Sequence, residues 1–142
     1  MKKTSAPLPR RLALVVHPDL AVLSSVQSAL GNRGINAIVA RDLPTALLAI
    51  NQHYFELAVV ATHLQENGDG WPLAGVIHLV FPKAFVCVLS PNEPDVLSLQ
   101  SAINYGVREI YSQSSAAPEL VDAIITRADS AMGGTSRTSR VQ

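Results

Sequence analysis

The stretch ELAVVATHLQENGDG, residues Glu56 to Gly70, decides which fold the sequence predicts. Its first half holds the continuous apolar run Leu57 to Ala61, and its second half is polar and rich in glycine. A short run of small and β-branched apolar residues is typical of a strand that is buried on both faces of a parallel sheet. The polar half predicts a loop with a turn at the carboxyl end of that strand.

The same alternation of short apolar runs and helix-period segments extends over most of the chain. Helix boundaries are marked by Asp42 as a candidate cap, by Pro72 in a first turn and by Gly106 as a stop. Strands that alternate with helices form parallel sheets with helices packed on both faces, so the sequence predicts an α/β fold with three layers. The expected strands are residues 12–16, 35–40, 57–61, 85–89 and 109–111, and the expected helices are residues 19–30, 43–50, 71–81, 95–105 and 117–131.

Length and composition predict one globular domain. The chain has 142 residues, of which 48% are hydrophobic and 15% are charged, a balance that supports a buried core. The periodic segments cover residues 11–131. We expect residues 1–10 to form a flexible basic leader and residues 132–142 to form a disordered tail or a linker, since neither has apolar periodicity.

The charges are unevenly spread, although the formal net charge is zero. Six of the eleven basic residues lie at positions 2, 3, 10, 11, 137 and 140, which leaves five basic against eleven acidic residues in the body, a balance of about −6. This acidic excess argues against nucleic acid as a partner of the folded part. No run approaches the roughly 18 to 20 apolar residues that span a bilayer, and the single cysteine, Cys87, suits a reducing compartment, so we expect a cytoplasmic protein.

Three short motifs occur in order along the second half of the chain: Asp69-Gly70-Trp71, Val88-Leu89-Ser90 and Ala102-Ile-Asn-Tyr-Gly106-Val. With these motifs and this order of elements, residues 11–131 resemble the receiver domains of response regulators in two-component signalling. The resemblance implies a flavodoxin-like (βα)5 fold, in which a five-stranded parallel sheet has the strand order 2-1-3-4-5. It also places a site where the carboxyl ends of the central strands meet.

The residues at that site depart from the family's pattern. Receiver domains carry an acidic pair after the first strand, which holds magnesium, but this chain has His17 and Pro18 there, with Asp19 next. The phosphorylated aspartate of the family falls on Ala61. The lysine that contacts the phosphoryl group falls on Gln113. The family's metal ligands, acceptor and lysine are therefore all replaced.

Of the groups that the resemblance places at the site, only the hydroxyl is retained, at Ser90. Alanine has no nucleophile, so no acyl phosphate forms at Ala61. Magnesium requires several hard oxygen ligands, and the usual carboxylates are absent, so we expect the magnesium site to be lost and no cofactor to be bound. The sequence has no phosphate-binding loop and no nucleophile elbow, and we expect no enzymatic activity.

Polar residues around the altered site leave two interpretations open. His17 and His63 follow strands that should be neighbours, and Asp19, Glu66 and Asp69 lie in nearby loops. Two imidazoles with carboxylates are ligands that zinc or another transition metal accepts. In the other interpretation these side chains are hydrogen-bonded polar residues at the rim of a vestigial pocket.

The retained frame and the altered site predict a pseudo-receiver that is not phosphorylated at the usual position. We expect it to act by protein–protein interaction or dimerisation, and not on nucleic acid or membranes. The resemblance implies that the interaction uses the face formed by the fourth helix, fifth strand and fifth helix. The alternative is a ligand- or metal-sensing variant that uses the remodelled pocket. The candidate residues of the interaction face are Leu97, Ser101, Tyr105, Ile110 and Tyr111.

Overall fold

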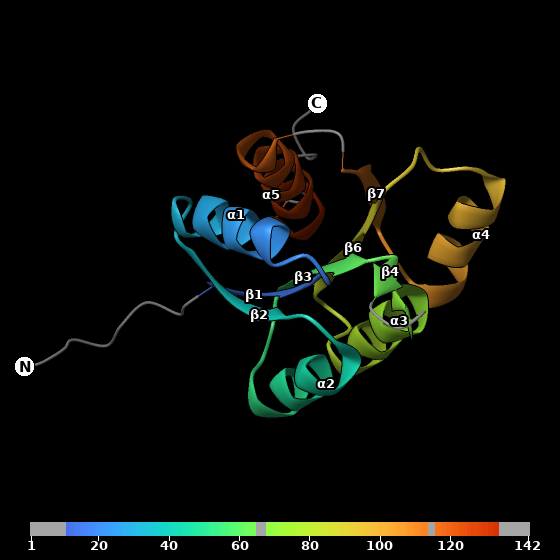
Figure 1. Cartoon of the computed structure of the whole chain (residues 1–142), viewed down its shortest axis with the longest axis horizontal. Helices are drawn as coiled ribbons and strands as arrows, with labels where there is room; N and C mark the ends of the chain where they lie inside the picture. The colour runs from blue at the N-terminus through green and yellow to red at the C-terminus, as the bar shows by residue number, and fades with distance from the viewer. Residues whose placement is uncertain (1–10, 65–67, 114–115, 134–142) are drawn as a thin grey trace, which may run out of the picture.

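The fold is an open, twisted sheet between two layers of helices (Figure 1). The computed structural model describes residues 11–64, 68–113 and 116–133. The α5 helix ends at Gly133, two residues beyond the expected boundary at 131, and the other residues of the expected leader and tail lie outside the described residues. The elements are β1 (Arg11–Val16), α1 (Leu20–Gly31), β2 (Ile35–Ala40), α2 (Leu43–Gln52), β3 (Leu57–Ala61), β4 (His63–Leu64), β5 (Gly68–Asp69), α3 (Gly70–Val80), β6 (Phe85–Ser90), α4 (Val96–Tyr105), β7 (Glu109–Ser112) and α5 (Ala117–Gly133).

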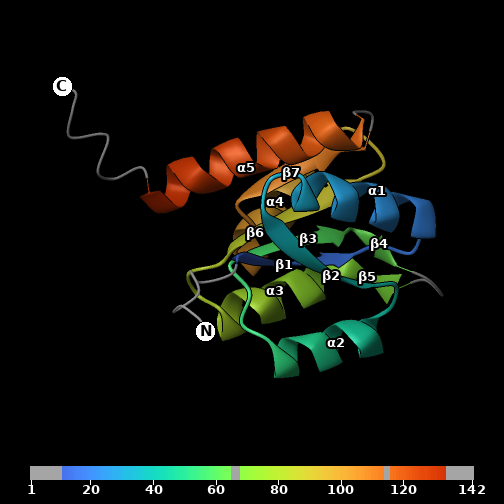
Figure 2. The same cartoon turned by 90° about the vertical axis from the view of Figure 1, so that its left-hand side faces the viewer.

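The main sheet has five parallel strands in the order β2-β1-β3-β6-β7. Counted without the short strands β4 and β5, this is the predicted order 2-1-3-4-5, so the flavodoxin-like expectation is confirmed. The helices α1 and α5 cover one face, and α2, α3 and α4 cover the other (Figures 1 and 2). Because all strands run in the same direction, their carboxyl ends gather at one edge of the sheet.

Each central strand is buried on both faces. In β1, Leu14 and Val16 pack toward α2 and α3, while Ala13 and Val15 pack toward α1 and α5. All six residues of β6 are buried as well. This burial explains why the strands appear in the sequence as continuous apolar runs and not as alternating ones.

Four helices begin at aspartate caps. The side chains of Asp19, Asp42, Asp69 and Asp95 each accept a hydrogen bond from a backbone N–H in the first turn of α1, α2, α3 and α4. Such a carboxylate satisfies a donor that the helix cannot pair by itself. At the other end of α4, Gly106 has a φ of 73°, a left-handed conformation that favours glycine as a helix stop.

The polar stretch after β3 is not the simple loop that the sequence predicts. His63 pairs with Asp69, and Leu64 pairs with Gly68, in a short antiparallel hairpin of β4 and β5. Leu64 is buried in the core cluster under α2 and α3. This burial fixes the hairpin, and a local pattern of polar residues gives no sign of it. Among the described helices, none has the length and apolarity that crossing a membrane requires.

Candidate functional site

The carboxyl-end edge of the sheet brings together four predicted site residues. Beyond the strands, backbone hydrogen bonds continue the pairing: His17 N–H donates to Ala40 O at 3.1 Å, and Gln113 N–H donates to Ser90 O at 3.0 Å. Ala61 is the last residue of β3 and pairs in register with Leu89 of β6. These bonds place His17, Ala61, Ser90 and Gln113 at one edge, as the resemblance implies.

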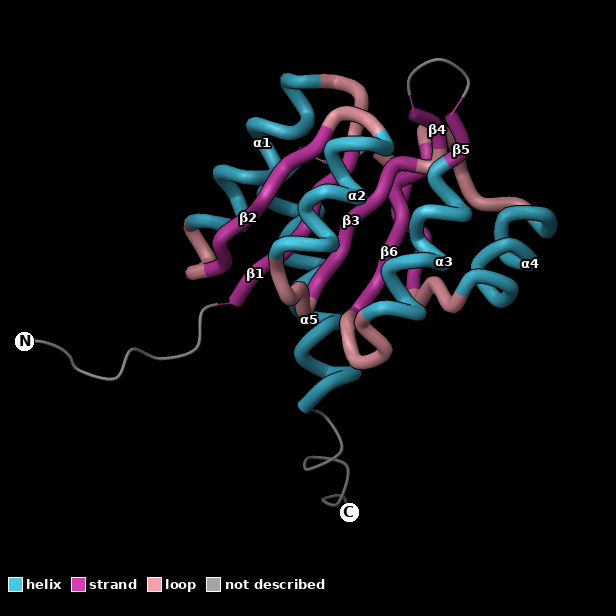
Figure 3. The backbone as a smooth tube through the Cα atoms, turned by 90° about the horizontal axis from the view of Figure 1, so that it is seen from below, coloured by secondary structure: helices cyan, strands magenta, loops and turns pink. Residues whose placement is uncertain are grey.

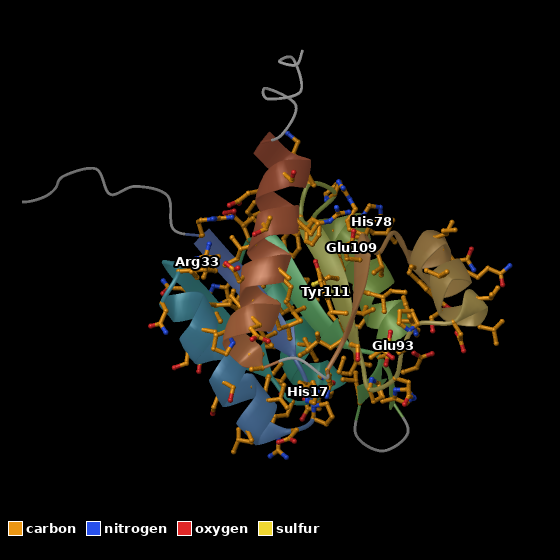
Figure 4. All side chains as sticks on the ribbon, turned by 90° about the horizontal axis from the view of Figure 1, so that it is seen from above. His17, Arg33, His78, Glu93, Glu109 and Tyr111 are labelled. Carbon is orange, nitrogen blue, oxygen red and sulfur yellow. The ribbon has the colours of Figure 1, made fainter. Side chains whose placement is uncertain are left out.

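A side-chain hydrogen bond joins the two ends of this edge. His17 Nε2 lies 2.7 Å from Gln113 Oε1, and His17 Nδ1 accepts the backbone N–H of Asp19 at 3.0 Å. Since Nδ1 is an acceptor, the ring proton is on Nε2, which donates to the Gln113 carbonyl. His17 is 5% exposed, so a neutral imidazole with both nitrogens hydrogen-bonded lies where the pattern of the resembled family has an acid (Figure 4).

The strand end that would carry a phosphorylated group is closed by backbone. Ala61 is 3% exposed. A Cβ added at Gly70 would lie 1.8 Å from Ala61 O, so α3 begins directly against this strand end. The Asp-Gly motif at the start of α3 is thus explained by a close approach that only glycine permits. The site contains no nucleophile at this position.

The remaining polar groups are paired locally. Ser90 Oγ accepts the backbone N–H of Asn92 at 3.2 Å, and Thr62 Oγ1 lies 2.9 Å from His63 Nδ1. Asp19 is exposed and accepts Ala21 N–H at 2.9 Å as the cap of α1. The hydroxyl retained at Ser90 therefore supports the turn after β6.

Pro18, at the second position of the family's acidic pair, also makes a structural hydrogen bond. Pro18 O accepts a hydrogen bond from Arg41 Nε at 3.2 Å, which ties the start of α1 to the end of β2. The acidic pair of the resembled family thus corresponds to an imidazole that is hydrogen-bonded through both ring nitrogens and to a proline that offers its carbonyl, while the adjacent Asp19 caps α1. Neither residue of the pair presents a carboxylate oxygen to the strand ends.

The proposed metal ligands do not converge. Among residues 11–64, 68–113 and 116–133, no three His, Cys, Asp or Glu side chains lie close enough to hold a metal ion. His63 and Asp69 are neighbours in the β4–β5 hairpin, but both nitrogens of His17 are engaged elsewhere. His17, His63 and Asp69 thus form no group of metal ligands within the described part of the chain, Glu66 lies outside that part, and the zinc hypothesis stays a prediction.

The predicted interaction residues lie in different environments. Leu97 is exposed, while Ser101 and Tyr105 are half-buried on the inward side of α4. The Tyr105 ring lies against α3, since a Cβ added at Gly75 would be 2.7 Å from it. Ile110 packs on the core under α2 and α3. Of these, Leu97 is the one with a largely free side chain.

Three α4 residues that were not predicted are exposed apolar groups. Val96, Leu99 and Ile103 expose 77%, 55% and 80% of their surfaces. Their spacing of three and four residues puts them on one stripe of the helix. Asn104 and Tyr105 line a groove with α3 on the opposite flank, so this stripe lies on the side of α4 that faces away from α3. The periodicity is a property of the sequence, but the direction of the stripe is not.

The thiol of Cys87 and the hydroxyl of Tyr111, which lie on the face of the sheet covered by α1 and α5, are unreactive. Burial raises the pKa of the Cys87 thiol far above its ordinary value, and its Sγ donates to Ala58 O at 3.5 Å. Burial also raises the pKa of the Tyr111 phenol. Within the described part of the chain, the Tyr111 hydroxyl is buried without a hydrogen-bond partner, beside α5 (Figure 4). Neither group is available as a nucleophile at neutral pH.

A scan of the sequence against protein-family models finds no match, and neither does a search of the curated proteins. The structure, in contrast, is similar to many solved receiver domains. One is the CheY-like receiver domain of Methanospirillum hungatei JF-1, with a TM-score of 0.76 and 20% identity over 85% of this chain and 95% of that chain.

Two further neighbours have comparable agreement. The signal receiver domain of an HD domain-containing protein from Pseudomonas fluorescens Pf-5 has a TM-score of 0.76 and 25% identity, over 89% of this chain and 99% of that chain. A response regulator from Burkholderia pseudomallei, solved with a phosphorylated aspartic acid, has a TM-score of 0.73 and 20% identity, over 92% of this chain and 76% of that chain. The chain therefore has the fold of the receiver domains of response regulators.

Proposed function

We propose that this chain is a pseudo-receiver: a receiver-fold domain that is not phosphorylated at the usual site, has no catalytic activity and acts by binding protein. The observation that carries this proposal is the 2.7 Å hydrogen bond between His17 and Gln113. It gives a neutral, paired contact to the two positions that supply metal ligands and a cation in the resembled family. A doubly paired histidine leaves no acid to hold a magnesium ion there.

Ala61 supports the same proposal, because its side chain cannot accept a phosphoryl group. The Burkholderia pseudomallei neighbour was solved with a phosphorylated aspartic acid and a calcium ion. Phosphorylation of that kind needs a carboxylate, a divalent cation and a cationic contact for the phosphoryl oxygens. Here the strand end carries a methyl group, covered by the start of α3.

The face formed by α4, β7 and α5 is the proposed binding surface. Its apolar part is the stripe Val96, Leu99 and Ile103, and its polar part is the ion pair between Arg127 of α5 and Glu109 of β7. An apolar centre beside a polar rim is the usual composition of a protein interface. The acidic body of the chain favours a protein partner over nucleic acid, and we place this role in the cytoplasm.

The phosphorylation half of the proposal is tested by NMR of the full chain with beryllofluoride and magnesium. We expect no shifts localised around residues 17, 61, 90 and 113, because no carboxylate is present to coordinate the beryllium. A receiver domain that carries the usual aspartate serves as the technical control. Saturable shifts confined to those positions would show that the site still accepts a phosphoryl analogue.

The binding half is tested with the variant Ile103→Glu, which puts a charge in the centre of the stripe. Leu20→Glu is a matched control, because Leu20 is 58% exposed but lies on α1, on the other face of the sheet. Quantitative co-purification from the source cells should lose a specific protein with Ile103→Glu and retain it with Leu20→Glu. Equal recovery with both variants would remove this face as the binding surface.

A further inference from the structure

A second apolar surface lies on the face of the sheet covered by α2 and α3. Neither helix contains an aspartate, glutamate, lysine or arginine. Seven large apolar side chains from these helices and the residues after α2 remain 38% to 79% exposed. This surface, the α2–α3 face, consists of Leu43, Leu47, Leu48, Tyr54, Val76, Leu79 and Val80.

The seven side chains lie on the same face of the sheet, where Val76 and Leu79 also line the groove between α3 and α4. The helices α2 and α3 are neighbours on the same side of the sheet (Figures 1 and 3). The ring of Tyr54, just after α2, contacts Phe81, just after α3, edge to face at 5.3 Å between centroids. Leu43 and Leu47 are four residues apart, as are Val76 and Val80, so each pair forms a stripe along its helix.

The exposed area of this face has the size of an interface core. Burying a large aliphatic side chain removes roughly 100 Å² of apolar surface, so the seven partly exposed side chains offer on the order of 400 Å². A standard interface buries about 800 Å² on each partner, somewhat more than half of it apolar. The α2–α3 face thus supplies nearly the whole apolar part of one side of such an interface.

The charges around the face favour a copy of the same chain as its partner. An uncharged surface pairs with another uncharged surface without leaving buried charges unpaired. At the two ends of α3, exposed Asp69 precedes the helix and exposed Lys83 follows it. A twofold axis across the middle of α3 brings Asp69 of one copy toward Lys83 of the other, so opposite charges meet at both rims.

Residues 1–10, MKKTSAPLPR, and residues 134–142, GTSRTSRVQ, contain no long run of apolar residues. We propose that two copies of this chain associate through their α2–α3 faces as an isologous dimer. This inference is independent of the proposed function, which uses the face formed by α4, β7 and α5.

The test is sedimentation of the full chain from about 1 to 100 µM, a range that covers weak to moderate dimers. We expect a reversible monomer–dimer equilibrium in that range. Leu79→Glu should weaken it by roughly 100-fold or more, since each substitution in a twofold interface acts twice. Leu79 is 79% exposed, so the variant should remain folded, and its circular dichroism verifies this.

Ile103→Glu is the matched comparison, because Ile103 is 80% exposed on the other candidate surface. The proposed dimer should be unaffected by it. A wild-type chain that stays monomeric at 100 µM, or a dimer that survives Leu79→Glu, overturns the inference. A dimer lost with Ile103→Glu and kept with Leu79→Glu assigns self-association to the face of the proposed function and also overturns it.

A cross-link tests the twofold geometry directly. Val76 lies near the middle of α3, so Val76→Cys should form a disulfide with its own copy under mild oxidation. The native Cys87 is fully buried and does not compete. Leu20→Cys on α1 should remain unlinked at the same concentration. Equal cross-linking of both variants would show random collision and count against the dimer.

Discussion

His17 and Gln113 are 96 positions apart in the sequence, yet their side chains are joined by a hydrogen bond of 2.7 Å. This bond connects the residue after β1 to the residue after β7, across the carboxyl-end edge of the sheet. Both side chains are uncharged and hydrogen-bonded, whereas the resembled family has an acid and a lysine at these two positions. Its contribution to stability can be measured.

Gln113→Ala should destabilise the fold by about 1 to 3 kcal/mol, because it leaves the buried Nε2–H of His17 without an acceptor. Urea unfolding of the variant measures this loss. A double-mutant cycle with His17→Ala should give a coupling energy of about 1 kcal/mol or more. Additive effects of the two substitutions would show that the bond contributes nothing in solution.

Tyr111→Phe should leave the free energy of unfolding unchanged or raise it by about 1 kcal/mol. The hydroxyl is buried, and among the described residues it has no partner, so its removal relieves an unpaired polar group. Chemical denaturation at neutral pH makes the comparison. A clear loss of stability would mean that the hydroxyl is hydrogen-bonded in solution.

The same residue predicts a change at alkaline pH. Burial raises the pKa of Tyr111 above its unfolded value near 10. The associated stability is therefore present in full below that value and is lost as the pH rises toward the folded pKa. Between about pH 9 and 11, the wild-type chain should lose more stability than Tyr111→Phe, which has no group to ionise there. Parallel pH profiles would contradict the raised pKa.

Asp95 predicts an acid-dependent loss at the start of α4. The backbone N–H of Ser98 donates to the carboxylate and lowers its pKa. A lowered folded pKa gives stability that is present above the unfolded value of about 3.9 and lost as the pH falls through the folded one. Asp95→Asn keeps a cap that does not titrate, so its unfolding free energy should fall less between about pH 5 and 2. Equal acid sensitivity would exclude this contribution.

Two glycines form a matched pair of substitutions. A Cβ at Gly70 would lie 1.8 Å from Ala61 O, which is backbone, so Gly70→Ala should cost about 3 kcal/mol or more. At Gly31, the last residue of α1, nothing lies within 4 Å of an added Cβ, so Gly31→Ala should be neutral or slightly stabilising. Thermal unfolding of both variants makes the comparison, and a tolerated Gly70→Ala would contradict the tight contact at the strand end.

Much of the fold followed from local sequence because its cause is local. Runs such as Leu57 to Ala61 are buried on both faces, and Asp42 and Gly106 act at helix ends through bonds to nearby backbone. The strand order came from resemblance to a known family and not from the runs themselves. The replaced residues at positions 17, 61 and 113 were also evident in the sequence, because they are identities at fixed places in that frame.

Other features depend on contacts between distant segments. The hairpin of β4 and β5 exists because Leu64 reaches a core built by α2 and α3, and no pattern within residues 63–69 indicates it. Periodicity placed Val96, Leu99 and Ile103 on one stripe, but only packing against α3 fixes which way the stripe faces. The amino-acid sequence is thus sufficient to specify the elements and the absence of an acceptor at position 61, since both are local properties. The pairing of His17 with Gln113, and the choice of which apolar side chains stay exposed, come from tertiary packing, since both depend on what the fold brings next to each residue.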